Sequence, residues 1–377
     1  MNRKIVFFGA LPPKDESKVG GGEWGNLRTV NMLRKFGYDV TAIRKTSVKT
    51  TRSRWFKIFT TPFRTFWDVL KVAFVLAQNK NAVFHFSGFA WKTIYMEYLV
   101  IRVAKMMGCR LIYEIRGGGL LASYANGGNR YSHSLKYILS HSDYIFTQGK
   151  ENIPLLNNLC GIPVYHYANC VSENFYPPTK PTKAHGSIGI VYFGRISPDK
   201  NISLIVDTTR ILQQSRKNVS LTIIGNGQDQ AYIDSIHEEA HRGLRQDSYV
   251  FIPGCTHDKL KNILQDKHFY LFPSQVVLEG QSNSVTEAMS YGIVPIASPQ
   301  GFNRSTIGND NLIVEKYVAE EYAKRINEII DKNELDYYSE FVYRRFLDNY
   351  TESVVFEKTR IVYNEIYGNY AETTDLG

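Results

Sequence analysis

The chain has 377 residues, about two and a half times the size of an average domain, so two domains are expected. With 43% hydrophobic and 21% charged residues, the composition excludes an intrinsically disordered, collagen-like or coiled-coil protein. The formal net charge of +9 comes from +15 in residues 1–180 (25 Lys/Arg, 10 Asp/Glu) and −6 in residues 181–377 (20 and 26). The basic first half therefore favours an anionic partner, such as nucleic acid, a phosphorylated metabolite or a membrane surface.

Short apolar segments alternate with helical patterns through the first half of the chain. A first strand is expected at 4–9, followed by a glycine-rich loop and a helix from about 24 to 36, which Gly37 ends. Further buried strands are expected at 38–43, 82–86, 110–115, 144–147 and 164–167, with helical segments between them. This alternation predicts a parallel sheet covered by helices.

A Pro- and Lys-rich stretch at 176–185, YPPTKPTKAH, has no periodicity and is the best candidate for a linker. The alternation then restarts. Strands are expected at 188–193, 220–224, 249–252, 269–272 and 294–297, and helices at 202–214, 229–240, 260–265 and 284–291. We therefore expect an α/β protein with two Rossmann-like, doubly wound domains, at 1–178 and 179–351, each binding ligands at the carboxyl ends of its strands.

The cysteines and the lengths of the apolar runs indicate the cellular compartment. The four cysteines, at 109, 160, 170 and 255, are far apart and form neither a C-x-x-C pair nor a zinc-type spacing, which favours reduced thiols in a cytosolic protein. The first residues have too short an apolar run for a signal peptide, and no uncharged run reaches the roughly 18 residues of a membrane span. We expect no segment that crosses a bilayer.

The first candidate site is the loop that follows the strand expected at 188–193. Gly194 and Arg195 follow strand 188–193, and Lys200 lies just before the next helix. Arginine offers a planar fork and lysine a point charge, and both stand at a helix N-terminus whose amides favour anions, which predicts a diphosphate clamp. A surface loop with two solvated cations remains the alternative for this segment alone.

A polar loop, EGQSNS, leads from strand 269–272 into the helix at 284–291. Its amides, with Asn283 or Ser284 as N-cap, suit a phosphate. Glu279 in the loop and Glu287 in the helix are carboxylates, which accept strong hydrogen bonds from hydroxyl groups. Two carboxylates with a phosphate site between them suit a nucleotide sugar, whereas a capped helix with an exposed glutamate is the alternative.

These motifs carry a resemblance to a known family. The second half resembles the donor-binding half of the retaining family 4 glycosyltransferases of GT-B fold, through Gly194-Arg195…Lys200, Ile224-Gly225-Asn226-Gly227, Phe251-Ile252-Pro253-Gly254, Pro273-Ser274 and Glu279-Gly280…Glu287-Ala288-Met289. In the first half, Tyr167-Ala168-Asn169-Cys170-Val171 and Ser142-Asp143-Tyr144 are similar to family segments more loosely. The resemblance implies two Rossmann-like domains facing across a cleft, with a last helix near 352–370 that returns to the first domain.

The resemblance also implies roles by position. Arg195 and Lys200 would hold the donor diphosphate and stabilise the leaving phosphate, while Glu287 would bind the ribose and Glu279 the transferred sugar. The remaining donor contacts would come from the loop amides and from the backbone that reads the base: Gly194, Gln281, Ser282, Asn283, Ser284, Ile252 and Pro253. No Asp-x-Asp triplet is present, and the cations with a helix N-terminus supply positive charge, so neither a metal nor a cofactor is expected.

Two departures from the family pattern affect the site. Four residues, 275–278, separate Pro-Ser from Glu-Gly where the family has two or three, so a displaced Glu279 loop is expected. The family's first-domain histidine position falls on Arg116, with His85 as the other candidate. We expect Arg116 and the glycines after it to line the cleft and to contact phosphate or sugar, whereas a histidine between aromatic residues favours a structural role.

The glycines before the first helix, Gly20-Gly21-Gly22, resemble the family's first-domain glycine-rich loop, which faces donor and acceptor. Glycine lets the backbone approach a ligand closely. A flexible surface loop is the alternative, and the dinucleotide pattern G-x-G-x-x-G is absent.

Residues 44–67 combine cations with aromatic rings, and residues 44–64 contain no acidic residue. The cations are Arg44, Lys45, Lys49, Arg52, Arg54, Lys57 and Arg64, and the rings are Trp55, Phe56, Phe59, Phe63, Phe66 and Trp67. This mixture is typical of a segment that binds anionic headgroups and inserts rings at a membrane surface. The alternatives are a solvated helix with a buried aromatic stripe, and a nucleic-acid surface, for which no RNA-binding module pattern is present.

Taken together, these expectations describe a retaining glycosyltransferase that moves a sugar from a nucleoside diphosphate donor, UDP in preference to GDP, to a lipid-linked saccharide. It would act as a peripheral protein at the cytoplasmic face of the cell membrane, in bacterial-type surface polysaccharide assembly, without a nucleic-acid partner. Two alternatives remain: a GT-B-fold nucleotide-sugar 2-epimerase, and a non-catalytic membrane or nucleic-acid adaptor.

Overall fold

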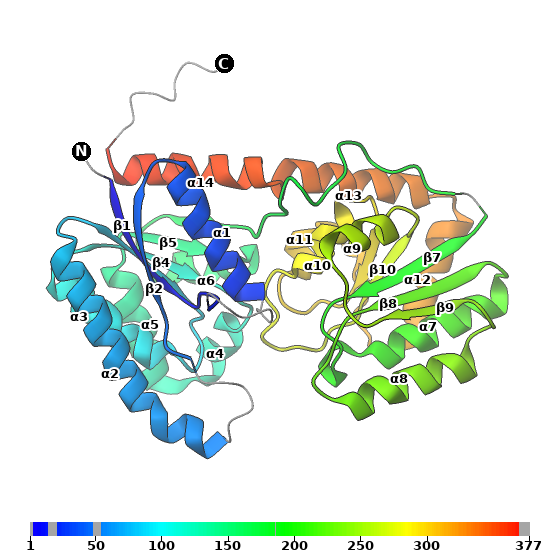
Figure 1. Ribbon diagram of the computed structural model, residues 1–377, viewed down its shortest axis with the longest axis horizontal. Helices are drawn as coiled ribbons and strands as arrows, with labels where there is room; N and C mark the ends of the chain where they lie inside the picture. Colours follow the sequence, from blue (N-terminus) through cyan, green and yellow to red (C-terminus); the bar gives the residue numbers. More distant parts are fainter. Residues whose placement is uncertain (1–2, 14–20, 48–53, 185, 369–377) are drawn as a thin grey trace. The chain divides into compact units, whose positions relative to one another are not determined.

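The computed structural model describes residues 3–13, 21–47, 54–184 and 186–368 (Figure 1). Its internal contacts divide the chain into two units, the first comprising Met1–Tyr167 with Phe356–Gly377 and the second Ala168–Val355. Each unit has one parallel β-sheet covered by helices, as the alternation of strand and helix patterns predicts.

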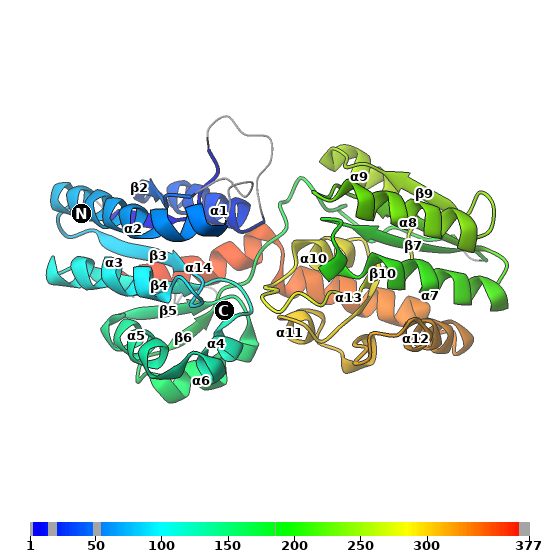
Figure 2. The ribbon, with the colours of Figure 1, turned by 90° about the horizontal axis from the view of Figure 1, so that it is seen from below.

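The sheet of the first unit has six parallel strands in the order β2-β1-β3-β4-β5-β6 (Figure 2). The strands are β1 (Lys4–Gly9), β2 (Asp39–Arg44), β3 (Val83–Gly88), β4 (Arg110–Ile115), β5 (Tyr144–Thr147) and β6 (Val164–His166). The inner strands are almost entirely buried, which is why they read as continuous apolar runs rather than alternating ones.

Helices cover both faces of this sheet. They are α1 (Gly21–Lys35), α2 (Arg54–Gln78), α3 (Ile94–Met106), α4 (Leu120–Asn126), α5 (Gly128–His141), α6 (Ile153–Leu159) and α14 (Glu352–Ile366), with one 3-10 turn, η1 (Lys150–Asn152). One core, which includes Val72 of α2, Val100 of α3 and Leu135 of α5, covers one face. On the other face the ring of Tyr363 in α14 lies against His85 and Phe146, and Phe36, the residue after α1, contacts Phe356 of the same helix.

The sheet of the second unit has five parallel strands in the order β11-β10-β7-β8-β9. The strands are β7 (Ile188–Phe193), β8 (Val219–Ile224), β9 (Tyr249–Ile252), β10 (Phe269–Phe272) and β11 (Val294–Ala297). The central strands β7 and β10 are buried along almost their whole length, so the core of this unit lies on both sides of them.

The helices of the second unit follow the same doubly wound plan. They are α7 (Ile202–Ser215), α8 (Gln230–Gly243), α9 (His257–Leu264), α10 (Asn283–Met289), α11 (Asn303–Ile307), α12 (Ala319–Asp331) and α13 (Leu335–Asn349), with two 3-10 turns, η2 (Pro198–Lys200) and η3 (Asp310–Leu312). Helices α7, α8 and α12 lie on one face of the sheet and α9, α10 and α13 on the other (Figure 1).

Both sheets reverse their strand order at one point, between β1 and β3 in the first unit and between β7 and β10 in the second. In open parallel sheets the loops after the strands diverge at such a point and leave room for a ligand. The segments singled out in the second half, after β7 and after β10, therefore leave adjacent strands at the reversal.

The division of the chain falls between Tyr167 and Ala168, ahead of the boundary expected at residue 178. The reason is that Val171 pairs with Thr351 in a β-bridge and donates its N–H to the carbonyl of Tyr350 at 2.8 Å, so this segment belongs with the second unit. From Phe356 on, α14 counts with the first unit. Among the described residues no helix is both long and apolar enough to cross a membrane, and the four cysteines are all free thiols.

Candidate functional site

The loop after β7 approaches the loop after β8 closely enough to require glycine. Gly194 has φ of +145° and donates its N–H to the carbonyl of Ile224 at 3.0 Å. A Cβ at Gly225 would overlap with the carbonyl oxygen of Gly194. The buried Tyr192 donates its hydroxyl to the carbonyl of Arg195 at 2.7 Å, which holds the backbone at the start of this loop. The Gly-Arg pair is thus built into a tightly packed strand end.

Lys200 and Glu279, 79 residues apart in the chain, form an ion pair at the carboxyl ends of β7 and β10. Ser274 joins them: its hydroxyl donates to Glu279 Oε2 at 2.8 Å and accepts from Lys200 Nζ at 3.4 Å. The ammonium also lies 4.8 Å from the centroid of the Phe272 ring. The two charged side chains are only 11% and 13% exposed, so this is a partly dehydrated, mutually neutralised cluster at the reversal of the sheet.

Arg195 differs from Lys200 in being open to solvent. Its side chain is 59% exposed and its guanidinium contacts Asp199 Oδ2 at 3.2 Å, in an ion pair of the weak, exposed kind. The carbonyl of Asp199 accepts the N–H of Gln275 at 2.8 Å, which ties the loop after β7 to the loop after β10. Arg195 is therefore placed beside the Lys200–Glu279 cluster with its fork accessible to an anion from solvent.

The loop that carries Glu279 is firmly held in spite of its extra residue. The N–H of Glu279 bonds to the carbonyl of Val276 at 3.0 Å, so the four residues 275–278 are taken up by a turn. A Cβ at Gly301 would overlap with the carbonyl of Glu279, and Ser298 donates to the carbonyl of Ser274 at 2.7 Å. Glu279 is thus brought to Lys200 rather than turned away from it.

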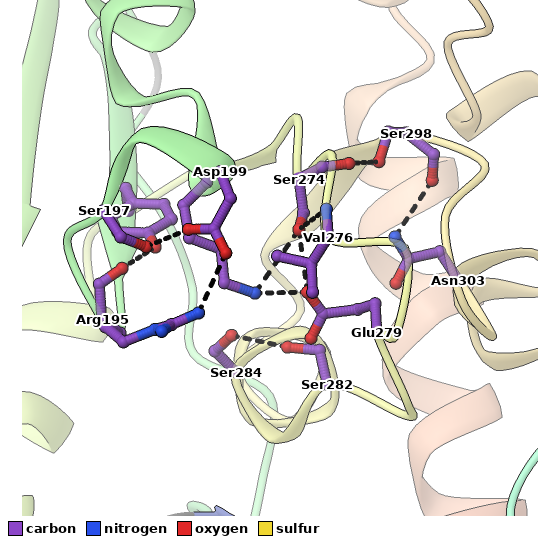
Figure 3. Close-up of polar contacts among 12 residues, drawn as sticks. Arg195, Ser197, Asp199, Ser274, Val276, Glu279, Ser282, Ser284, Ser298 and Asn303 are labelled. Atoms are coloured by element: carbon purple, nitrogen blue, oxygen red, sulfur yellow. Dashed lines mark hydrogen bonds and ion pairs between the residues drawn. The ribbon is translucent and has the colours of Figure 1, made fainter. Parts of the chain in front are cut away.

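Helix α10 begins directly after this loop, with Ser282 as its N-cap residue. The hydroxyls of Ser282 and Ser284 lie 2.9 Å apart, and the Ser284 hydroxyl also bonds to Tyr270 at 2.6 Å. Asn283 is the first helical residue, and Glu287 lies within the helix, partly buried. The loop and helix therefore present a cluster of hydroxyls next to Glu279, as Figure 3 shows.

Gln281 has a structural role that the sequence did not reveal. Its side chain is buried and pairs with the backbone of Asn169: it accepts the Asn169 N–H at 2.7 Å and donates to the Asn169 carbonyl at 3.1 Å. The Asn169 side chain in turn donates to the Gln281 carbonyl at 3.2 Å. Only the backbone N–H of Gln281 remains for the diphosphate contact implied by the resemblance, because its side chain fixes the start of the second unit.

The segment expected to read the base lies at the end of β9. The carbonyl of Ile252 accepts the N–H groups of Gly225 and Gly254, at 3.0 and 2.8 Å, so both of its lone pairs are used within the protein. Pro253 is exposed beyond it. Base contacts from this segment would have to come from Pro253 and later residues.

Arg116 is buried within the first unit. Its side chain is 4% exposed, and its Nε lies 2.6 Å from Glu114 Oε1 while Nη2 donates to Thr29 at 2.9 Å. Burial acts to raise the pKa of Glu114, but Arg116 and His85 outweigh it and lower that pKa. Its charge is thus paired with that of Glu114 inside the first unit, and the expected contact of Arg116 with phosphate or sugar stays a prediction.

His85 takes the structural role that its aromatic neighbours favour. It is fully buried, with Nε2 3.0 Å from Glu114 Oε2 and Nδ1 bonded to the hydroxyl of Tyr363 in α14. A signal for this network was present in the sequence: Glu114 lies in β4 and Arg116 directly follows that strand, two residues later, and side chains two apart on an extended segment share a face.

The glycines before the first helix become part of it. Helix α1 begins at Gly21, not near residue 24, so Gly21 and Gly22 are exposed residues of its first turn, and Gly20 lies outside the described residues. A Cβ at Gly22 would be 3.8 Å from the ring of Phe89, an ordinary contact. The structure therefore shows no steric need for glycine at residue 22.

The aromatic residues of the basic segment lie on α2 and are exposed. Exposed fractions reach 70% for Trp55, 72% for Phe59 and 77% for Phe63. Asp68, Val72 and Leu76, one helical turn apart, are the residues of α2 that are buried. Residues 48–53, which include Lys49 and Arg52, lie outside the described residues. A buried aromatic stripe, one of the alternatives for this segment, is thereby excluded.

In the loops after β7 and β10, three further partners of predicted residues were missed. Asp199 pairs with Arg195, Ser274 bridges Lys200 and Glu279, and Tyr270 bonds to Ser284. Ser274 belongs to the Pro-Ser motif and Asp199 precedes Lys200, so both had a local signal, whereas Tyr270 reads as a core strand residue. Within the described ranges, no group of three or more His, Cys, Asp or Glu side chains is placed to hold a metal ion.

Comparison with known proteins finds a family match within the second half. Residues 178–343 match the model of the family described as glycosyl transferases group 1. A segment of 132 residues is 26% identical to the gpi3 subunit of phosphatidylinositol N-acetylglucosaminyltransferase from Schizosaccharomyces pombe. That match covers 35% of this chain and spans about a quarter (27%) of the length of the curated relative.

Solved structures match nearly the whole chain at low identity. A glycosyltransferase from Rickettsia africae has a TM-score of 0.74 at 15% identity, covering 98% of this chain and 99% of that one. Sucrose-phosphate synthase from Thermosynechococcus elongatus has a TM-score of 0.73 at 15% identity, covering 97% and 99%. HepE from Anabaena, solved with UDP, has a TM-score of 0.70 at 13% identity, covering 96% and 100%. The chain thus has the GT-B fold, and residues 178–343 carry the match to glycosyl transferases group 1.

Proposed function

We propose that the protein is a retaining glycosyltransferase that takes a sugar from a nucleoside diphosphate donor, UDP in preference to GDP. The observation that carries the proposal is the Lys200–Glu279–Ser274 cluster at the sheet reversal of the second unit, with Arg195 beside it. The match of residues 178–343 to glycosyl transferases group 1 supports it.

Sugar transfer from a nucleoside diphosphate requires positive charge next to the departing phosphate. In the transfer, the bond between the anomeric carbon and the diphosphate oxygen breaks, and the acceptor hydroxyl forms the new bond on the same face of the sugar. The hydroxyl proton passes to the departing phosphate. Charge develops on that phosphate, and a positioned lysine and arginine stabilise it in a site of low water content. Lys200 and Arg195 supply these two cations, so the proposal includes no metal and no cofactor.

The remaining roles follow the order of the loops. Glu279 touches the transferred sugar, and Glu287 in α10 binds the ribose hydroxyls. Backbone amides at the start of α10, from residues 281 to 284, meet the diphosphate, with Gly194 at the end of β7. The residues after Ile252 face the base. In this arrangement the donor lies mainly on the second unit, and Gly21 and Gly22 of the first unit face it.

UDP is favoured on the evidence of relatives. HepE is solved with UDP and with UDP-glucose, and a pneumococcal O-GlcNAc transferase of TM-score 0.60 is solved with UDP and GlcNAc. These are properties of those proteins, and they make UDP-sugars the first donors to test here.

The acceptor proposed is a lipid-linked saccharide, in bacterial-type surface polysaccharide assembly. The first unit supplies the basic charge, +15 in residues 1–180, and α2 exposes its aromatic rings to solvent. Cations and rings on one helix suit the interface of an anionic membrane. The protein would thus act from the cytoplasm as a peripheral protein on the inner face of the cell membrane. The name of the curated relative, a phosphatidylinositol N-acetylglucosaminyltransferase subunit, also points to a lipid acceptor for that relative.

The test is a panel of nucleotide sugars. UDP- and GDP-sugars are incubated with the protein and protection against thermal unfolding is recorded. The product formed with lipid-linked acceptors is identified by mass, and its anomeric configuration by NMR. We expect one UDP-sugar to raise the melting temperature and to be consumed, with a product of unchanged anomeric configuration and with full activity in EDTA. No stabilisation by any donor would contradict the proposal.

A variant links the test to the site. Glu287→Ala should abolish turnover of that donor, because it removes the ribose contact, whereas Glu238→Ala, an exposed glutamate on α8, should retain it. Equal turnover by both variants would show that the donor site has been placed wrongly.

A further inference from the structure

A cavity of about 570 Å³ lies between the edge strand β2 and helix α2 in the first unit. Residues 41–47 form one wall, and Lys71, Phe74 and Val75 of α2 form the other. All of its lining residues belong to the first unit, whereas Arg195, Lys200 and Glu279 belong to the second.

Three cations line this cavity: Arg44, Lys45 and Lys71. The carboxylate of Asp68, which is 2% exposed, offsets one of them through an ion pair of 2.6 Å with Lys71. Asp68 also accepts two hydrogen bonds from Thr46, from its N–H at 3.1 Å and from its hydroxyl at 2.6 Å, so this carboxylate is already saturated by donors. The walls of the cavity thus carry an excess of positive charge.

Lys45 is the partly buried one of the two lining cations that have no side-chain partner in the described ranges, the other being the exposed Arg44. Within the described ranges its ammonium makes neither a hydrogen bond nor an ion pair, although the side chain is partly buried. Burial lowers the pKa of this amine, against the raising effect of Glu97 and Asp68. Glu97 cannot serve it as a partner, because its carboxylate is held by Tyr113 at 2.5 Å and Thr93 at 2.6 Å. A partly dehydrated cation of this kind is stabilised by an anion that enters the cavity.

The cavity opens next to an apolar surface. Phe74 lines it and is 65% exposed, and Leu70, Trp67 and Phe63 follow at three- and four-residue spacing on the same face of α2, all exposed. A ligand that fits both features has an anionic group for the cavity and hydrocarbon for the helix face. An anionic phospholipid has both parts in one molecule.

We infer that this cavity binds the headgroup phosphate of an anionic phospholipid, with Lys45 and Arg44 on the phosphate and the exposed face of α2 against the acyl chains. The inference depends on the membrane part of the proposed function and is independent of the donor chemistry. It assigns the headgroup to one place on the first unit, in place of a diffuse attraction by the whole basic surface.

The experiment measures binding to vesicles by co-sedimentation. Vesicles of phosphatidylcholine alone and of phosphatidylcholine with phosphatidylglycerol are compared for the wild type, Lys45→Met and Lys80→Met. Lys80 is exposed two residues beyond the end of α2 and does not line the cavity, so its loss removes the same formal charge. We expect Lys45→Met to weaken binding to the anionic vesicles by about fivefold or more, since a cation near an anionic surface contributes roughly 1 kcal/mol. Lys80→Met should change it by less than twofold.

Folding does not obscure the result. Because Lys45 has no partner to lose, Lys45→Met should melt at or above the wild-type temperature. Binding of Lys45→Met to anionic vesicles with wild-type affinity would overturn the inference. Failure of the proposed donor chemistry would show separately, as absence of protection of the wild type by any nucleotide sugar.

Two further arms identify the source of the phosphate. Dihexanoylphosphatidylglycerol below its micellar concentration should compete with the vesicles, whereas inorganic phosphate at the same concentration should not. Equal competition by inorganic phosphate would indicate a free-phosphate site and overturn the lipid assignment. The lipid assignment would also be overturned if a single-stranded oligonucleotide bound the wild type more tightly than the vesicles do and bound Lys45→Met only weakly.

Discussion

Lys200 and Arg195 carry the same formal charge, but Lys200 is largely buried and Arg195 is exposed, so their loss should have different effects. Lys200 is 11% exposed and paired with Glu279, whereas Arg195 is 59% exposed and paired with Asp199 at the surface. A cation held in place by a buried partner is preorganised, and its loss leaves that partner's charge uncompensated. The two side chains can therefore be separated by measuring stability and rate together.

Lys200→Met should lower the free energy of unfolding by roughly 3 kcal/mol and the transfer rate by about 100-fold or more. Arg195→Met should change the free energy of unfolding by less than about 1 kcal/mol, because the pair that it loses is exposed, while still lowering the rate. Urea unfolding and initial rates at saturating donor check both. An equal loss of stability in the two variants would contradict this division of roles.

Lys183 gives the second unit a pH dependence. It lines a cavity of about 780 Å³ near the amino ends of the strands, and burial lowers the pKa of its amine from 10.5 to about 7. Between those two values the unfolded chain binds a proton that the folded protein does not, so the free energy of unfolding rises with pH from about 7 to about 10. One such group contributes at most about 1.4 kcal/mol per pH unit.

Lys183→Met should flatten this rise and stabilise the protein near pH 7, as urea unfolding at a series of pH values would show. Lys217→Met is the matched control, since Lys217 lines the same cavity but is exposed. The assignment fails if both variants keep the wild-type slope.

At the scale of elements, the close approach of two strand ends fixes the position of Arg195. A Cβ on Gly225 would overlap with the carbonyl oxygen of Gly194, a backbone atom that cannot rotate away. Gly225→Ala should therefore push apart the loops after β7 and β8, cost roughly 1–3 kcal/mol of stability, and raise the KM for the donor.

Gly243→Ala, at the end of α8, is the control for Gly225→Ala. The atom nearest to an added Cβ there is Cδ of Arg210 at 3.4 Å, on a flexible side chain, and alanine is favoured over glycine in a helix. Its stability should stay within about 1 kcal/mol of the wild type in the same urea titrations. Wild-type stability and KM in Gly225→Ala would show that the loops tolerate separation.

The elements show what sequence reasoning can and cannot reach. Buried parallel strands are continuous apolar runs bounded by polar residues, so the bounds of β4, β7 and β10 were predicted without error. Helix starts were less well predicted: α9 begins at His257, because the side chain of Thr256 caps the N–H of Lys259, and α1 begins at Gly21. A helix cap is a single residue with no periodicity, so the sequence pattern gives little information on where a helix begins.

The candidate site divides in the same way. The loops after β7 and β10 were placed correctly, because parallel strands bring their carboxyl ends to one edge of the sheet. The contacts between the loops, such as the Lys200–Glu279 pair and the Gln281–Asn169 pair, depend on residues 79 and 112 positions apart and carry no local signal. The Arg116–Glu114 pair was missed because the prediction considered the place of Arg116 after a strand but not the acidic partner two residues before it.

At the scale of the whole molecule, charge is divided between the two halves of the chain. Residues 1–180 carry +15 and residues 181–377 carry −6. Long-range attraction to an anionic surface should therefore come from the first half, while donor binding in the second half depends on the short-range contacts of a few cations. Exposed charges are screened by salt much more strongly than partly buried ones.

Salt should accordingly separate the two activities. Raising the ionic strength from 0.1 to 1 M shortens the Debye length from about 10 to about 3 Å, so binding to anionic vesicles should weaken at least tenfold. The KM for the nucleotide sugar should change by a smaller factor, because Lys200 is 11% exposed and held against Glu279. Co-sedimentation and initial rates with a water-soluble acceptor, measured over the same salt series, check both.

Neutral vesicles are the control, since what binding they show comes from the aromatic face of α2 and should persist in salt. Parallel losses of vesicle binding and donor affinity would mean that one basic surface serves both ligands, contrary to the division proposed here.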